Sequence, residues 1–135
     1  RFGDPETQVV LPLLTSDLLT VMQATTHGTL ADTEVAFSDK HACCVILASN
    51  GYPTSYKKGF EMTFTPEALA ATFVAGGALK EGKLVTSGGR VTGTTAIADS
   101  LEEAIKEAYR LSDGVQFEGA YRRSDIGQRA LQALK

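Results

Sequence analysis

The sequence predicts an α+β fold in which helices pack on a mainly antiparallel sheet. A continuous apolar run from residue 41 to 49 has the length and composition of a buried strand. A capping box at Ser100 and Glu103 opens a segment with apolar residues on one helical face. Several short strand patterns are joined by turns instead of alternating with helices. This order is typical of an antiparallel sheet with helices on one face.

The composition describes a soluble globular protein. Hydrophobic residues make up 43% of the 135 residues and charged residues 21%. The net charge of −3 gives no field that would gather nucleic acid or an anionic membrane. No apolar run approaches the roughly 18 residues of a membrane span. We therefore expect a cytoplasmic protein with no nucleic-acid or membrane partner.

Two helices are predicted at the start of the chain. The first covers residues 5–14, with Asp4 as N-cap and Pro5 in the first turn, and Pro12 should kink or split it. The second begins after Ser16 as N-cap and ends at Gly28. A polar connection with a short strand at 34–37 follows.

The central and C-terminal parts are predicted from turn residues and periodicity. After the strand at 41–49 we expect a turn at 50–53, a helical turn at 65–67, a strand at 72–75, a hairpin at 78–85 and a strand at 91–98. The helix from Ser100 should end at Gly114. A short strand at 115–118, a basic loop at 119–124 and a helix capped by Asp125 complete the domain.

The cysteines and histidines give no metal-ligand pattern. Cys43 and Cys44 are adjacent on a strand and point to opposite faces, so we expect reduced core thiols. His27 and His41 are isolated. No transition-metal site is predicted.

Two stretches carry candidate chemistry. Arg1 and Asp4 are charged side chains presented around Gly3 and Pro5. Gly88 and Gly89 precede Arg90, and exposed backbone amides beside a guanidinium can bind phosphate. A glycine pair at a strand start is also typical of a simple turn or bulge. The pattern is neither a Walker A loop nor a dinucleotide fingerprint.

Four segments together resemble the phosphoribosylamine–glycine ligase family of ATP-grasp enzymes: RFGDPETQ, ASNGYPTSYKKG, SGGRVTGTTA and FEGAYRRSDIGQRAL. The resemblance implies that the parent enzyme joins glycine to 5-phosphoribosylamine through a glycyl phosphate, in de novo purine biosynthesis. ATP would be the co-substrate, with Mg²⁺ or Mn²⁺ as the metal.

The same resemblance implies roles for individual residues. Arg1 would stabilise charge during phosphoryl transfer, and Asp4 would orient the substrate amine or accept its proton. Arg90, with Gly89, would hold the ribose 5-phosphate of the substrate. The family reads FHAGT where this chain reads FVAGG, so Val74 and Gly77 depart from the pattern and receive no role.

The resemblance also implies a division of the chain. Residues 1–30 would be the end of the ATP-grasp domain and 31–135 a C-terminal α+β domain. The Glu-x-Asn metal ligands and most of the ATP site would lie before Arg1, so we expect no metal ligand in this chain. Without the N-terminal and ATP-grasp parts, the isolated chain should be inactive. Two alternatives remain: a non-catalytic ligand- or partner-binding module, and another ATP-grasp carboxylate–amine ligase.

Overall fold

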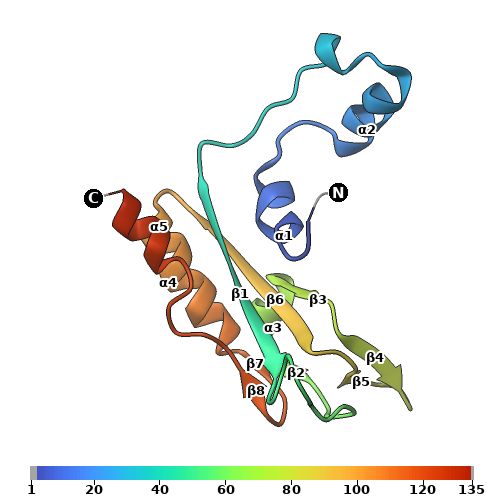
Figure 1. Ribbon diagram of the computed structural model, residues 1–135, viewed down its shortest axis with the longest axis vertical. Helices are drawn as coiled ribbons and strands as arrows, with labels where there is room; N and C mark the ends of the chain where they lie inside the picture. Colours follow the sequence, from blue (N-terminus) through green and yellow to red (C-terminus); the bar gives the residue numbers. More distant parts are fainter. Residues whose placement is uncertain (1–2, 135) are drawn as a thin grey trace.

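The computed structural model describes residues 3–134 as a four-stranded sheet, two small two-stranded ribbons and helices packed around them (Figure 1). The α+β fold class is confirmed. In chain order the elements are α1 (Thr7–Val10), η1 (Leu11–Leu13), α2 (Leu18–His27), η2 (Leu30–Asp32), β1 (His41–Ser49), β2 (Thr63–Phe64), α3 (Pro66–Ala70), β3 (Thr72–Val74), β4 (Gly77–Lys80), β5 (Lys83–Thr86), β6 (Arg90–Ala98), α4 (Leu101–Ser112), β7 (Val115–Gln116), β8 (Ala120–Tyr121) and α5 (Gln128–Ala133).

The main sheet is antiparallel with strand order β3-β6-β1-β8. Its centre is the long β1–β6 pair, which runs from His41 opposite Ala98 to Ala48 opposite Arg90. The register shifts between Leu47 and Ala48, so β6 carries one extra residue there. This irregularity lies immediately beside Arg90, the first residue of β6.

The core lies between the sheet and α4. Cys43, Val45 and Ala96 on the strands pack against Ala104, Ile105, Ala108 and Leu111 on α4. The hydroxyl of Ser100 accepts a hydrogen bond from the amide of Glu103 and donates one to the Glu103 carboxylate at 3.0 Å, which confirms Ser100 as the N-cap. A second cluster joins Leu47 and Val91 to the small elements β2, α3 and β7.

The opposite face of the sheet carries α1. The hydroxyl of Thr95 donates to the backbone carbonyl of Gln8 at 2.9 Å, and the thiol of Cys44 donates to its side-chain oxygen at 3.3 Å. A Cβ at Gly93 would lie 1.8 Å from that oxygen, so a larger residue here would have to displace the Gln8 side chain. α4 and α1 therefore lie on opposite faces of the sheet, whereas the sequence analysis described helices on one face.

The start of α1 differs from the prediction. The helix begins at Thr7, and Glu6 occupies the N-cap position without a side-chain cap. Asp4 is not the N-cap. Its backbone amide donates to the Glu6 carboxylate at 2.6 Å, and its own carboxylate forms an ion pair with Arg90. Pro12 lies in η1, so the predicted splitting of the first helix is confirmed.

The second helix is capped one residue later than predicted. Asp17, not Ser16, accepts the hydrogen bond from the amide of Thr20 at 2.7 Å. The Ser16 hydroxyl instead accepts from the amide of Ala36, so it fastens the following connection. That connection forms an isolated bridge with Leu14 instead of the predicted strand at 34–37. Gly28 ends α2 with φ of 73°, as expected.

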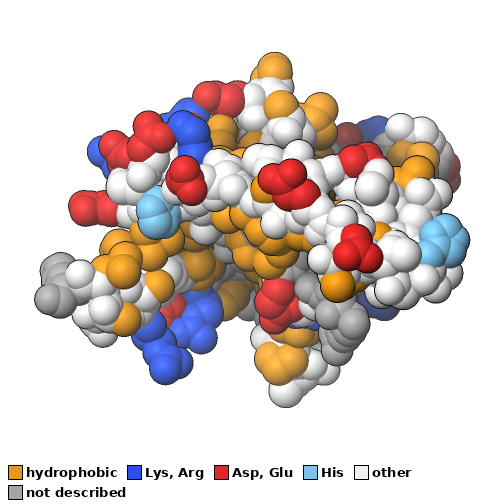
Figure 2. Space-filling model, turned by 90° about the horizontal axis from the view of Figure 1, so that it is seen from above, with side chains coloured by type: hydrophobic (Ala, Val, Ile, Leu, Met, Phe, Trp, Pro, Cys, Tyr) orange, Lys and Arg blue, Asp and Glu red, His pale blue; other side chains and the backbone are white. Residues whose placement is uncertain are grey.

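The helix α2 and the connection after it project from the sheet (Figure 1). Only Ala24 of α2 is buried. Figure 2 looks onto this end of the molecule and shows hydrophobic side chains exposed across the middle of the face. Exposed hydrophobic residues in this N-terminal part are Val10, Leu19, Met22, Leu30, Val35 and Phe37.

The C-terminal part contains one strand that the sequence did not indicate. Within the predicted basic loop, Ala120 and Tyr121 form β8 and pair with Ser49 and Ala48. The strand expected at 115–118 is only two residues long. Asp125 does not cap the last helix, because its carboxylate pairs with Arg123.

Both cysteines are free thiols, with Cys43 buried and Cys44 half-buried. Burial raises the pKa of Cys43 to about 11, and it also raises the pKa of Cys44. Among residues 3–134, no helix is long and apolar enough to cross a membrane. The same residues contain no group of three or more His, Cys, Asp or Glu side chains placed to hold a metal ion.

Candidate functional site

Asp4 and Arg90, which the sequence indicated separately, meet in the structure. Nη2 of Arg90 donates to Oδ2 of Asp4 at 2.8 Å, and Nη1 donates to the backbone carbonyl of Asp4 at 3.3 Å. The two residues are 86 positions apart in the chain. The fold therefore brings together the loop before α1 and the start of β6.

The pair remains open to solvent. The side chain of Arg90 is 37% exposed and that of Asp4 is 57% exposed. An ion pair this exposed contributes little to folding stability. It does hold a guanidinium and a carboxylate side by side where a ligand can reach both.

The Gly88–Gly89 turn is packed against the protein. The amide of Gly88 donates to the carbonyl of Gly76 at 3.1 Å, so it is already engaged. A Cβ on Gly89 would lie 2.2 Å from Cδ2 of Tyr52, so the aromatic ring occupies the space that a side chain would need. Packing alone thus accounts for glycine at position 89, and its predicted contact with substrate stays a prediction.

Two other arginines are Arg1, to which the resemblance gave a catalytic role, and Arg122 in the predicted basic loop, to which it gave none. Arg1 lies outside the described residues, and its catalytic role stays a prediction. Arg122 is bound within the fold: it donates to the Ser112 hydroxyl, pairs with Asp113 and lies 5.2 Å from the centre of the Tyr109 ring. The network fastens the C-terminal segment to α4.

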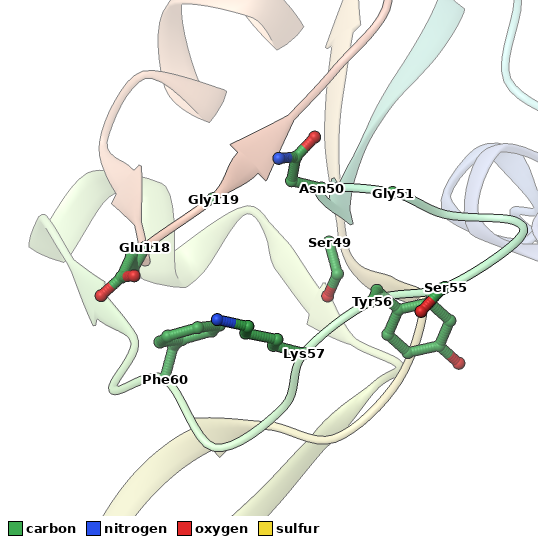
Figure 3. A pocket seen from close by; sticks show the side chains of 9 residues that line it. All are labelled: Ser49, Asn50, Gly51, Ser55, Tyr56, Lys57, Phe60, Glu118 and Gly119. Carbon is green, nitrogen blue, oxygen red and sulfur yellow. The ribbon is translucent and has the colours of Figure 1, made fainter.

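A cavity of about 430 Å³ lies between the loop that follows β1 and the residues just before β8, and no role was predicted for it from the sequence. Figure 3 shows Glu118 and Tyr56 on opposite sides of it, with Ser49 between them at the end of β1. Lys57 and Asn50 also contribute to its lining. The only signal available in the sequence was the clustering of turn-forming and polar residues after β1.

A second, more apolar cavity of about 680 Å³ lies next to Asp4. Asp4 and Gln8 line it together with Leu11, Pro12 and Phe73. Phe73 belongs to β3, one of the two edge strands of the main sheet. The Asp4–Arg90 pair is thus bordered by a hydrophobic surface.

The family model described as phosphoribosylglycinamide synthetase, C domain, matches residues 42–129, a span that includes all of β1 except its first residue, together with β6, α4 and Arg90. The chain belongs to this family.

Members of this family and a related solved structure resemble the chain over most of its length. The chain is 51% identical over 127 residues to a phosphoribosylamine–glycine ligase of Caldanaerobacter subterraneus, covering 93% of this chain and 30% of that protein. It is 49% identical over 139 residues to the human trifunctional purine biosynthetic protein adenosine-3, covering all of this chain and 14% of that one. It also resembles the crystal structure of the phosphoribosylamine–glycine ligase of Thermotoga maritima with a TM-score of 0.74 and 38% identity, covering 92% and 31% of the two chains. The chain therefore spans less than a third of these relatives.

Proposed function

We propose that this chain is the C-terminal part of a cytoplasmic phosphoribosylamine–glycine ligase of de novo purine biosynthesis. The full enzyme would use glycine, 5-phosphoribosylamine and ATP. The family membership supports the assignment, and the relatives named as this ligase are about three times longer than the chain. The missing N-terminal and ATP-grasp parts would supply most of the ATP site and the Mg²⁺ or Mn²⁺ ligands.

The Asp4–Arg90 pair is the observation that carries the proposal. Phosphoribosylamine has an anionic phosphate at one end and an amine at the other. A guanidinium can bind the phosphate through two parallel N–H groups, and a carboxylate can orient the amine. The structure places these two groups on one accessible surface, paired with each other at 2.8 Å. Because the phosphate and the amine lie at opposite ends of the ribose, the pair would separate when substrate binds.

The reaction would proceed in two balanced steps. A carboxylate oxygen of glycine attacks the γ-phosphorus of ATP, which forms glycyl phosphate and releases ADP. The amine of phosphoribosylamine then attacks the glycyl carbonyl carbon, inorganic phosphate leaves with the bonding electrons, and the nitrogen loses a proton. Asp4 would orient that amine or accept the proton, while Arg90 and Gly89 hold the ribosyl phosphate. Arg1 would stabilise charge in the first step.

The test uses the full-length ligase that the proposal requires. Arg90→Ala should raise the KM for phosphoribosylamine by tenfold or more, since an Arg–phosphate contact is worth roughly 1.5–3 kcal/mol. The KM for ATP should not change. Arg123→Ala is the matched control, because Arg123 is paired with Asp125 just before the last helix. This substitution should leave both KM values unchanged.

Three outcomes would contradict the proposal. An unchanged KM for phosphoribosylamine in Arg90→Ala would remove the assigned phosphate contact. ATP hydrolysis that requires an amine other than phosphoribosylamine would assign the chain to another ATP-grasp ligase. No ATP hydrolysis by the full-length protein with glycine and phosphoribosylamine would favour a non-catalytic module.

A further inference from the structure

Ser49 holds the turn that precedes Arg90. It is the last residue of β1 and only 4% exposed. Its backbone amide donates to the carbonyl of Gly89 at 2.8 Å, and its hydroxyl donates to the carbonyl of Gly88 at 2.9 Å. One side chain and its own amide therefore bind both glycine carbonyls.

The turn is also held on its other sides. The amides of Ser87 and Gly88 both donate to the carbonyl of Gly76, at 2.7 and 3.1 Å. The Tyr52 ring fills the space beside Gly89. Of the hydrogen bonds to this turn, the one from the Ser49 hydroxyl can be removed by a single substitution that neither changes the backbone nor adds volume.

Arg90 depends on this turn for its direction. It opens β6 opposite Ala48, just past the shift in register between β1 and β6. A rotation of the Gly89–Arg90 peptide would swing the long side chain away from Asp4, because small backbone changes are amplified along a side chain. The guanidinium position is thus set by the backbone that Ser49 binds.

We propose that Ser49 is a positioning residue for Arg90, acting through the carbonyls of Gly88 and Gly89. Without the hydroxyl, the Gly88 carbonyl loses its partner while the amide bond to Gly89 remains. The turn then relaxes on one side, and the guanidinium no longer stays against Asp4. The expected effect on substrate binding rests on the proposed function, whereas the expected effect on the position of the Arg90 side chain does not.

The geometric test uses the 135-residue chain and nitrogen-15 NMR. The Arg90 Nε–Hε signal, assigned by its absence in Arg90→Lys, should show a high heteronuclear NOE in the wild type and a clearly lower one in Ser49→Ala. Ser49→Thr keeps the hydroxyl and should restore the high value. If Ser49→Ala does not fold, Ser49→Cys, with its weaker donor, should give an intermediate value.

Ser112→Ala is the matched control. Ser112 is 1% exposed, and its hydroxyl donates to the carbonyl of Tyr109 at 2.8 Å. The variant loses this buried bond together with the contact that Arg122 donates to the same hydroxyl, yet it should leave the Arg90 signal unchanged. An Arg90 NOE in Ser49→Ala or Ser49→Cys equal to that of the wild type would overturn the proposal.

The kinetic test uses the full-length ligase. Ser49→Ala should raise the KM for phosphoribosylamine by about three- to tenfold, the effect of one hydrogen bond of about 1 kcal/mol, with the KM for ATP unchanged. Ser112→Ala should change neither. If Arg90→Ala raises this KM and Ser49→Ala does not, the proposal that Ser49 positions Arg90 is wrong. If Arg90→Ala has no effect, the proposed function fails, and the NMR comparison still decides whether Ser49 positions Arg90.

Discussion

At the scale of single residues, Gly89 shows how a glycine near a candidate site can be required by the protein itself. The sequence suggested that its bare backbone admits a ligand. The structure instead places the Tyr52 ring where a Cβ would be. The two explanations predict different behaviour when the ring is removed.

Gly89→Ala should therefore destabilise the chain by about 2 kcal/mol, as overpacking does. In a Tyr52→Ala background the same change should cost much less, because the Cβ gains room. Urea unfolding of the four proteins in the double-mutant cycle measures the coupling. Additive effects would show that the contact with Tyr52 is not the reason for glycine.

Thr92 is a second residue whose environment the sequence did not reveal. Its hydroxyl is buried and has no hydrogen-bond partner among the described residues. An unsatisfied buried hydroxyl costs free energy, and valine has nearly the same shape. Thr92→Val should raise the free energy of unfolding by about 1 kcal/mol.

Thr94→Val is the control for Thr92→Val. Thr94 is fully buried on the same strand, but its hydroxyl lies 2.9 Å from that of Thr72. Its replacement should lower stability by about 1 kcal/mol, because a satisfied hydrogen bond is lost. Equal effects of the two substitutions in urea unfolding would contradict the assignment of Thr92 as unsatisfied.

At the scale of elements, α4 and α2 have similar N-caps and very different surroundings. Ser100 caps α4, which forms one wall of the core. Asp17 caps α2, in which only Ala24 is buried. Loss of the cap should therefore lower the stability of the whole fold in the case of α4, and only the stability of the helix itself in the case of α2.

Ser100→Ala should lower the free energy of global unfolding by about 1 kcal/mol. Asp17→Ala should leave global unfolding unchanged and increase amide hydrogen exchange only within α2. Urea unfolding and hydrogen exchange on both variants provide the comparison. A lower free energy of global unfolding in Asp17→Ala would mean that α2 belongs to the cooperative core.

At the scale of the whole molecule, both hydrophobic clusters consist of residues after position 40. The segment before β1 adds polar contacts to the sheet through Gln8 and Asp4. This distribution agrees with the predicted boundary near residue 30, which stays a prediction. A truncated chain tests it.

A chain that begins at residue 38 should keep cooperative unfolding. It should also expose Cys44, whose thiol contacts Gln8 in α1 and whose pKa is raised mainly by burial. In a Cys43→Ala background, Cys44 should react with a thiol reagent at pH 8 much faster in the truncated chain than in the 135-residue chain. A truncated chain that does not fold would contradict the boundary.

The local part of this architecture could be read from the sequence. The strand at 41–49 and the hairpin at 78–85, which the structure extends to 77–86, were predicted because their side-chain periods and turn residues are local signals. The helix after Ser100 was predicted for the same reason. The strand at 120–121 was missed because its two residues have no pattern of their own and form a strand only through pairing with β1.

What the sequence by itself determined were the fold class, the principal elements and two separate candidate residues, Asp4 and Arg90. Only the tertiary structure decided that these two side chains meet, that α1 lies on the face opposite α4, and that Asp4, Ser16 and Asp125 bond elsewhere instead of capping helices. The physical reason is that a polar side chain binds the partner that folding brings within reach. For Arg90 that partner is 86 residues away, at a distance in sequence where no local pattern records it.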